Sequence, residues 1–261
     1  MLVPLYAPPR ISLRFWPVVM RNWLVWRKLA VPSVLGNIAE PLITLIAFGY
    51  GLGSMVGQID GRPYIEFLAS GSIVASAALA ATFEALYSAY SRMQVQKTWE
   101  SIMNAPIALD DVVFAEMVWA ALKALFSTSA IMVVIFILGI SRQPTLLLAL
   151  PVLGLVGITF ASVALIFNAL ARGYDFFTYY FTLVITPMTF LSGVYFPIAQ
   201  MPGWLQSVAA WLPLTAAVDL VRPLVLGRWP SAVWGPLAIL AAYAAAGYYV
   251  ALVLTRRRFF R

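Results

Sequence analysis

The chain has 261 residues, of which 62% are hydrophobic and 10% charged, and its mean hydropathy is +0.89. This composition excludes an ordinary soluble domain and indicates an integral membrane protein. The formal net charge is +7, and the absence of Cys and His excludes disulfides, thiol nucleophiles, histidine bases and the usual zinc or haem sites.

Polar joints divide the chain into a series of long apolar stretches. A hydrocarbon core of ~30 Å requires ~20 helical residues. Stretches near that length lie at about 34–56, 64–88, 112–139, 145–169, 176–196 and 232–254. We therefore predict an all-α integral membrane fold with six transmembrane helices, in which a segment over 1–33 precedes a transmembrane domain over 34–261.

The basic residues are distributed unevenly between the two ends of these spans. Twelve of the 17 lie before the first span, in alternate joints or in the C-terminal tail, four lie in the opposite joints, and Lys123 lies within the third span. Lys and Arg resist translocation, so both termini are predicted to be cytoplasmic. Because the positive charge is split between the two ends of a membrane domain, a nucleic-acid partner is not expected.

The segment before the first span has the pattern of an amphipathic helix. Cations fall on one helical stripe and large apolar side chains fall opposite. The cations are Arg10, Arg14, Arg21 and Lys28, and the apolar residues are Phe15, Val19, Trp23 and Trp26. This pattern predicts a helix at the membrane interface that contacts membrane lipids on the cytoplasmic leaflet. A charge cluster that only sets the topology is the alternative.

Three charged residues fall within predicted spans. Glu84 lies late in the second span, and Glu116 and Lys123 lie seven residues apart in the third, which places them on one helix face. A charge within the hydrocarbon must face protein, a partner or water, so these residues are candidates for a transport pathway. The alternative is that a glutamate pairs with Lys123 and only holds the two spans together. Tyr87 and Tyr179 are further pathway candidates, because aromatic faces can stack on sugar rings.

The cytoplasmic joint over about 91–111 is longer than a passive connector requires. Helix formers dominate until Pro106, and the residues Lys97, Thr98, Trp99, Glu100 and Ser101 combine mixed charge with a tryptophan expected to be exposed. We predict a short surface helix that docks onto a soluble partner, with a solvated linker as the alternative. Asp110 and Asp111, at the start of the third span, are predicted to cap that helix.

The section over 178–228 is apolar but interrupted by prolines about ten residues apart. They predict that one span ends near Phe196 and that short helices follow near 203–211 and 214–226. Irregular backbone at membrane depth needs cover by protein or water, so we predict a re-entrant hairpin over about 197–227. Its helix breaks are assigned to Gly193, Pro197, Pro202 and Pro213.

The sequence contains no phosphate-binding loop. None of its three lysines, Lys28, Lys97 and Lys123, follows a glycine, so the pattern GxxxxGK is absent. We predict no catalytic residues, no metal site and no cofactor bound by this chain. Any dependence on ATP must come from a partner subunit.

Several motifs together resemble those of a known transporter family. They are LSGVYFP at 191–197, MPGWLQ at 201–206, LPL at 212–214 and DLVRP at 219–223, with WRK at 26–28, PSVLGN at 32–37, ATFE at 81–84, TWE at 98–100 and YD at 174–175. The first four resemble the signature region of type-2 ABC exporter permeases. The remainder is similar to the nodulation J (NodJ) branch, permeases for export of lipo-chitooligosaccharide signals, and the resemblance covers nearly the full length.

The resemblance implies a homodimer of six-span subunits in a bacterial cytoplasmic (inner) membrane. A separate NodI-like nucleotide-binding ATPase would bind ATP and Mg and supply the energy. The segment 97–101 would be the coupling helix that docks onto this ATPase, the N-terminal helix would lie at the interface, and the hairpin would close an outer gate. The implied substrate is a lipo-oligosaccharide or another amphipathic glycolipid.

Other functions remain open at this point. A related permease could export a drug or a polysaccharide. An ion-coupled secondary transporter would use acids at the membrane midplane, for which Glu84 and Glu116 are available, but no internal repeat is evident. A membrane transferase would require a polar catalytic cluster, and only scattered Asp, Glu and Lys residues are present.

Overall fold

The computed structural model describes residues 5–59 and 61–260. The predicted N-terminal segment and the basic tail therefore extend beyond the described residues, at 1–4 and at Arg261. The longer helices are α1 (Phe15–Trp26), α2 (Ala30–Ile46), α4 (Tyr64–Phe83), α6 (Leu109–Ile137), α7 (Ala149–Leu170), α11 (Pro213–Val225) and α12 (Trp234–Phe260), and the shorter ones are α3 (Gly53–Val56), α5 (Thr98–Met103), α8 (Asp175–Tyr180), α9 (Thr186–Leu191) and α10 (Gly203–Ala209).

Irregular helical turns and one small hairpin complete the described chain. The 3-10 turns are η1 (Arg27–Leu29), η5 (Pro144–Leu148) and η7 (Ile198–Gln200), and the π turns are η2 (Ala47–Leu52), η3 (Glu84–Ser88), η4 (Ser91–Val95) and η6 (Phe181–Ile185). Strands β1 (Gln58–Ile59) and β2 (Arg62–Pro63) pair antiparallel, with Ile59 opposite Arg62.

Five helical runs in the described residues are long and apolar enough to cross a membrane. They are Phe15–Val56, Tyr64–Val95, Leu109–Ile137, Pro144–Leu170 and Trp234–Phe260. These correspond to five of the six predicted spans. The remaining one is shorter than predicted, because α8, η6 and α9 are continuous only over 175–191. These 17 residues, in three runs of 6, 5 and 6, lie at the short end of the ~17–25 residues that cross a bilayer.

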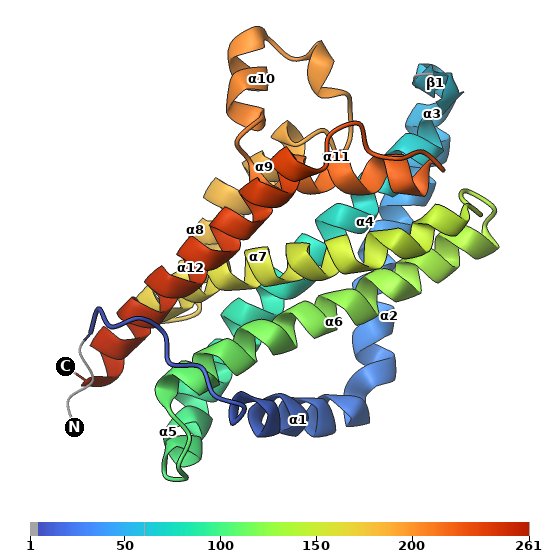
Figure 1. The fold of residues 1–261 in the computed structure, drawn as a ribbon. Helices are drawn as coiled ribbons and strands as arrows, with labels where there is room; N and C mark the ends of the chain where they lie inside the picture. The colour runs from blue at the N-terminus through green and yellow to red at the C-terminus, as the bar shows by residue number, and fades with distance from the viewer. Residues whose placement is uncertain (1–4, 60, 261) are drawn as a thin grey trace.

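The core consists of α4, α6, α7 and α12, which pack side by side (Figure 1). Small residues let these helices approach closely, as is common between membrane helices. A Cβ atom added to Gly157 of α7 would lie 2.9 Å from the Cα of Ala121 on α6. In contrast, only 6% of the most apolar stretch of Phe15–Val56 is buried, so this first helical run lies at the edge of the subunit.

Helix α1 lies across the end of the molecule that also carries α5 and both chain ends, and α2 leaves it in a different direction (Figure 1). The change of direction follows the η1 turn. The predicted stripe of four cations on one helix is wrong, because α1 contains only Arg21 of the four: Arg10 and Arg14 precede it and Lys28 lies in η1. The Arg10 and Ser12 amides instead donate to Asp110 and Asp111, which holds this segment outside the helix.

The proline-rich section forms the short helices that were predicted. Pro202 immediately precedes α10, Pro213 is the first residue of α11, and the two helices are bent by 86°. Pro197 precedes η7. Proline begins these helices because it has no N–H to leave unpaired in a first turn. Figure 1 shows α10 at the end of the molecule opposite α1 and α5.

Candidate coupling and transport site

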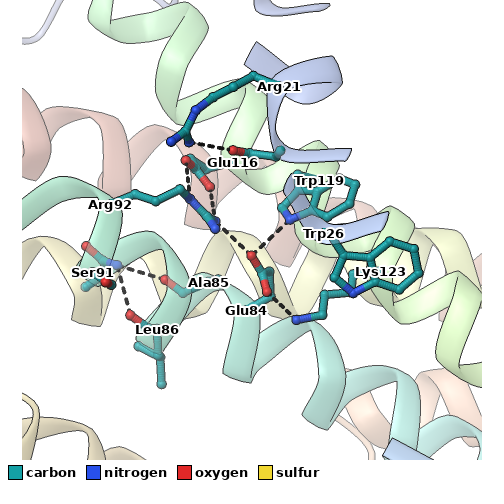
Figure 2. Close-up of polar contacts among 12 residues, drawn as sticks. Arg21, Trp26, Glu84, Ala85, Leu86, Ser91, Arg92, Glu116, Trp119 and Lys123 are labelled. Carbon is teal, nitrogen blue, oxygen red and sulfur yellow. Dashed lines mark hydrogen bonds and ion pairs between the residues drawn. The ribbon is translucent and has the colours of Figure 1, made fainter. Parts of the chain in front are cut away.

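Four charged side chains form a network where α4 and α6 meet near α1. Glu84 begins the π turn η3 directly after α4, and Arg92 lies in the next π turn, η4. Glu116 and Lys123 project from α6. Figure 2 shows Arg92 between the two glutamates, with Lys123 on the far side of Glu84. We call these four residues the charge network.

The contacts within the charge network are short and directional. Arg92 Nη2 lies 2.8 Å from Glu84 Oε1 and 2.5 Å from Glu116 Oε2, and its Nε donates to Glu116 Oε1 at 2.9 Å. Lys123 Nζ lies 2.6 Å from Glu84 Oε2. The indole of Trp119 also donates to Glu84, at 2.9 Å. Each carboxylate is thus bound by at least two donors.

The charge network is balanced and largely shielded from solvent. Glu84 and Glu116 are 2% and 1% exposed, and two cations oppose their two charges. Buried ions are tolerated when they are paired and hydrogen-bonded, and removal of one partner leaves a costly uncompensated charge. The alternative in which one glutamate pairs with Lys123 is found, with Glu84 as the partner, and Arg92 adds the second glutamate to it.

The short helix α5 is attached directly to this network. Trp99 is fully buried, stacks near Phe259, and donates through Nε1 to Glu116 Oε1 at 3.1 Å. The expectation of an exposed Trp99 is therefore wrong. The indole packs inward because its apolar ring meets the protein core while its N–H finds a carboxylate.

The outward face of α5 is polar and accessible. Lys97, Glu100 and Ser101 are exposed, and Thr98 is half-buried. Lys97 has a positive φ of 51°, which sets a sharp start to the helix. Helix α5 thus has one face that is free to contact a partner and one side chain, Trp99, that is bound to the charge network.

A cavity of about 400 Å³ opens beside the charge network. Its lining includes Glu84, Tyr87 and Lys123 of the predicted pathway, together with Arg21 and Trp26 of α1. Glu116 contributes to the network but is not among the described lining residues. The cavity therefore combines cations, a carboxylate and aromatic rings at the end of the molecule that carries α5.

Tyr179 does not lie with the other pathway candidates in this cavity, and its role in transport stays a prediction. Its side chain is 64% exposed and it does not line the cavity in the described part of the chain. The neighbouring residues Phe177 and Tyr180 are buried, and a residue between them points away because helical side chains rotate by ~100° per position. Tyr87 instead stacks on Tyr174, at 6.0 Å between ring centroids, and both rings line the cavity.

A second polar cluster lies beside the turn that follows α9. Gly193 has a φ of +73°, a conformation that favours glycine, and a Cβ there would lie 2.9 Å from Ile198 Cγ1. Arg222 of α11 donates to the Gly193 carbonyl oxygen at 2.6 Å and to Ser70 Oγ of α4 at 2.9 Å. Its guanidinium also lies 3.8 Å from the centre of the Phe67 ring. Arg222 thus joins the turn, α11 and α4.

The prediction that Asp110 and Asp111 cap α6 is wrong. The α6 N-terminus has no side-chain cap hydrogen bond in the described residues. Asp110 pairs with the buried Arg256 of α12 at 2.5 Å, and Asp111 accepts hydrogen bonds from Ser12. These aspartates hold the N-terminal segment and α12 against the start of α6, because buried carboxylates require strong donors.

The described residues offer no metal-binding cluster of acidic side chains. Sequence reasoning also missed two arginines that organise the sites. Arg92 was counted only as a topological charge, although it lies eight residues after Glu84, a spacing that places two side chains near one helix face. Arg222 could also have been identified from the sequence, because a cation in an apolar helical stretch requires a polar partner.

The chain matches known proteins over most of its length. A protein-family model described as ABC-2 type transporter matches residues 14–226. Nodulation protein J of Rhizobium meliloti (strain 1021) is 46% identical over 91% of each chain, and that of Rhizobium leguminosarum bv. viciae is 45% identical over 97% of this chain and 98% of its own. Nodulation protein J of Sinorhizobium fredii is 44% identical over 91% of each. Together with the apolar helical runs, these matches show that the chain belongs to the ABC-2 type transporter family, as a membrane-embedded permease.

Proposed function

We propose that this chain is the permease subunit of an ATP-driven exporter that moves a lipo-oligosaccharide, most simply a lipo-chitooligosaccharide, out of the cytoplasm. The substrate rests on the similarity to nodulation protein J over nearly the full chain. The observation that carries the transport mechanism is the hydrogen bond between Trp99 and Glu116. It connects a helix with an accessible polar face to charges between the membrane helices.

The energy source in this proposal is a separate NodI-like ATPase that binds ATP and Mg. It docks on the exposed side chains of α5, chiefly Lys97, Glu100 and Ser101. Motion of α5 reaches α6 through Trp99 and Glu116, and reaches the end of α4 through Arg92 and Glu84. A rigid element that moves as one body can shift packed helices between two arrangements.

The cavity beside the charge network is the proposed cytoplasmic entry for the substrate. Tyr87 and Tyr174 offer ring faces to a sugar, and Arg21 and Lys123 offer donors to its oxygen atoms. Its position near the uncovered helix α2 allows an acyl chain to remain in lipid. Pairing of both network glutamates with cations supports this function over an ion-coupled transporter, since ion coupling requires an acid that can exchange its proton or ion.

The proposed exporter contains two copies of this chain, oriented with their termini in the cytoplasm. Two copies form a homodimer in the bacterial inner membrane, with α1, α5 and both termini on the cytoplasmic side. The low burial of Phe15–Val56 supports a second copy or lipid beside it. Helix α1 lies at the cytoplasmic interface, and α10 with α11 forms a re-entrant hairpin that closes the outer side, held by Gly193 and Arg222.

Co-purification tests this function directly. The permease is co-expressed with the candidate ATPase, isolated in lipid nanodiscs, and assayed for ATP hydrolysis with and without an acylated chitooligosaccharide. The expected result is a complex of two permeases and two ATPases whose hydrolysis rises with the ligand. A folded permease that binds no ATPase, or that takes up substrate in response to an ion gradient alone, would contradict the proposal.

A further inference from the structure

Glu40 is an acid at membrane depth with no ion-pair or hydrogen-bond partner among the described residues. It lies on α2, twelve positions after Lys28 and sixteen before Val56. At 1.5 Å per residue these separations are about 18 Å and about 24 Å, so Glu40 lies within the hydrocarbon layer if the run Phe15–Val56 spans it. Its side chain is exposed on this subunit. A carboxylate at this depth must meet protein, water or a ligand.

The surroundings of Glu40 are polar and concave. A shallow groove of about 80 Å³ between α2 and α4 has as its polar lining Asn37, Glu40 and Thr44 from α2, Ser72 and Ser76 from α4, and Tyr195, with apolar residues such as Leu79 and Phe83 between them. We call it the Glu40 groove. The Asn37 amide donates to Ser127 Oγ at 2.8 Å, which fixes its orientation. The Ser76 hydroxyl donates to the Ser72 carbonyl at 2.7 Å, so its oxygen remains an acceptor toward the groove.

Ser72 provides an independent sign of a missing ligand. It is only 5% exposed, and its hydroxyl has no hydrogen-bond partner in the described part of the chain. Buried hydroxyls are normally paired, so an orphan one beside a free carboxylate is a functional signal. The groove thus offers one carboxylate acceptor, together with the hydroxyl-bearing residues Thr44, Ser72 and Tyr195, which can donate as well as accept. This set suits a ligand rich in hydroxyl groups.

An apolar cavity adjoins the groove beyond Tyr195. Its volume is about 380 Å³, and its lining includes Phe48, Phe190, Phe196 and Tyr195 itself. The Tyr195 ring lies 6.2 Å from the Phe48 ring and 5.3 Å from the Phe190 ring, between centroids. Tyr195 therefore separates a polar groove from an aromatic cavity, an arrangement that matches the two ends of an amphiphile.

We propose that the Glu40 groove binds the hydroxyl-rich saccharide head group of an amphiphile whose apolar chain enters the cavity beyond Tyr195. This inference rests on the proposed function for the saccharide nature of the ligand. The Glu40 carboxylate accepts hydrogen bonds from sugar hydroxyls, and Ser72 donates to a sugar oxygen. The site lies further along the same face of α4 than the entry cavity, toward the start of that helix, so it serves a later stage of passage.

Photolabelling of the permease without any ATPase tests the site. The protein is extracted with a styrene–maleic acid polymer, which avoids alkyl glycosides, and labelled with dodecyl maltoside that carries a diazirine beside its head group. Label is located by mass spectrometry. We expect it on α2 and α4 near Glu40, at least tenfold weaker in Glu40→Leu and weaker in Ser72→Ala, as loss of a hydrogen bond to a charged group predicts.

Controls separate the possible outcomes. Glu40→Gln keeps the shape and should label at an intermediate level, and Glu66→Gln, on an acid in a partly exposed ion pair, should label as wild type. Equal labelling of all variants would overturn the proposal. Labelling of the wild type by a dodecyl trimethylammonium probe at the same level as by the maltoside probe would also overturn it, because that probe has no saccharide head group. Because the chain has no cysteine, Glu40→Cys carries a single thiol, and rapid formation of disulfide-linked dimers would show that a second copy occupies the groove instead.

These results are independent of the test of the proposed function. Loss of the groove site would leave an ATPase complex and its stimulation intact. Absence of any ATPase partner would refute the exporter without changing the labelling of the isolated permease.

Discussion

The charge network predicts that replacing Arg92 lowers the free energy of unfolding by a large amount, and that a second substitution restores part of it. Arg92→Leu removes three donated hydrogen bonds and leaves Lys123, which contacts Glu84, as the only cation paired with either glutamate in the charge network. Glu84 keeps Lys123 and the Trp119 indole, but Glu116 keeps only the neutral indole of Trp99. Glu116 then has no ion pair among the described residues, and only the charge of Arg21, which donates no hydrogen bond to it, still opposes its own. Breaking a buried pair in this way costs about 3–5 kcal/mol.

A double substitution separates charge balance from lost packing. In Arg92→Leu/Glu116→Leu the remaining Glu84 and Lys123 are again balanced, so the double variant should be more stable than the single one by about 2 kcal/mol or more. Arg62→Leu is the matched control, because Arg62 also pairs with a glutamate but in a partly exposed ion pair. Its cost should be about 1 kcal/mol or less.

Equilibrium unfolding of the permease in mixed micelles, followed by tryptophan fluorescence, measures these free energies. The reasoning would be refuted if Arg92→Leu cost no more than Arg62→Leu. A double variant no more stable than Arg92→Leu would also contradict it, because the energy would then come from packing and not from charge.

The remaining predictions concern coupling and the outer turn. Glu100→Ala should abolish ligand-stimulated ATP hydrolysis while the unfolding free energy changes by less than about 0.5 kcal/mol, since the side chain is exposed; unchanged stimulation would remove the docking role. Trp99→Phe should lower both stimulation and stability, the latter by about 1.5–3 kcal/mol for a hydrogen bond to a charged group, and normal stability would argue against the Glu116 contact. Gly193→Leu should destabilise by about 1–2 kcal/mol from backbone strain alone and impair export, whereas Gly203→Ala, which meets open space, should not; equal effects would refute the strained turn. Lys123→Met should cost about 1–3 kcal/mol, less than Arg92→Leu because Lys123 is 19% exposed, and an unfolding curve identical to wild type would show the residue to be incidental.

Features set by local chemistry were predictable from the sequence. Five spans follow from the length of apolar runs, and the starts of α10 and α11 follow from Pro202 and Pro213, because proline restricts its own backbone and that of its neighbour. The positive φ of Gly193 likewise agrees with its assignment to a helix break. The pairing of Glu84 with Lys123 could be anticipated because charges in apolar spans require partners.

Features set by distant contacts were not predictable. Trp99 was expected at the surface, since a six-residue helix does not reveal which residues cover it. Asp110 has the local pattern of a cap, yet its partner Arg256 lies 146 positions away. The outward direction of Tyr179 was likewise not evident, since Phe177 and Tyr180 have similar side chains and occupy the buried face. Periodicity identifies a face of a helix but not what that face meets.

In the proposed mechanism, α5 transmits the action of an ATPase to the charge network during export. Measuring ATP hydrolysis by the reconstituted complex of permease and ATPase against the concentration of an acylated chitooligosaccharide, for wild type and Glu100→Ala, tests this role. We expect saturable stimulation in the wild type and basal hydrolysis without stimulation in the variant. Equal stimulation in both, or a wild-type permease that binds no ATPase, would contradict it.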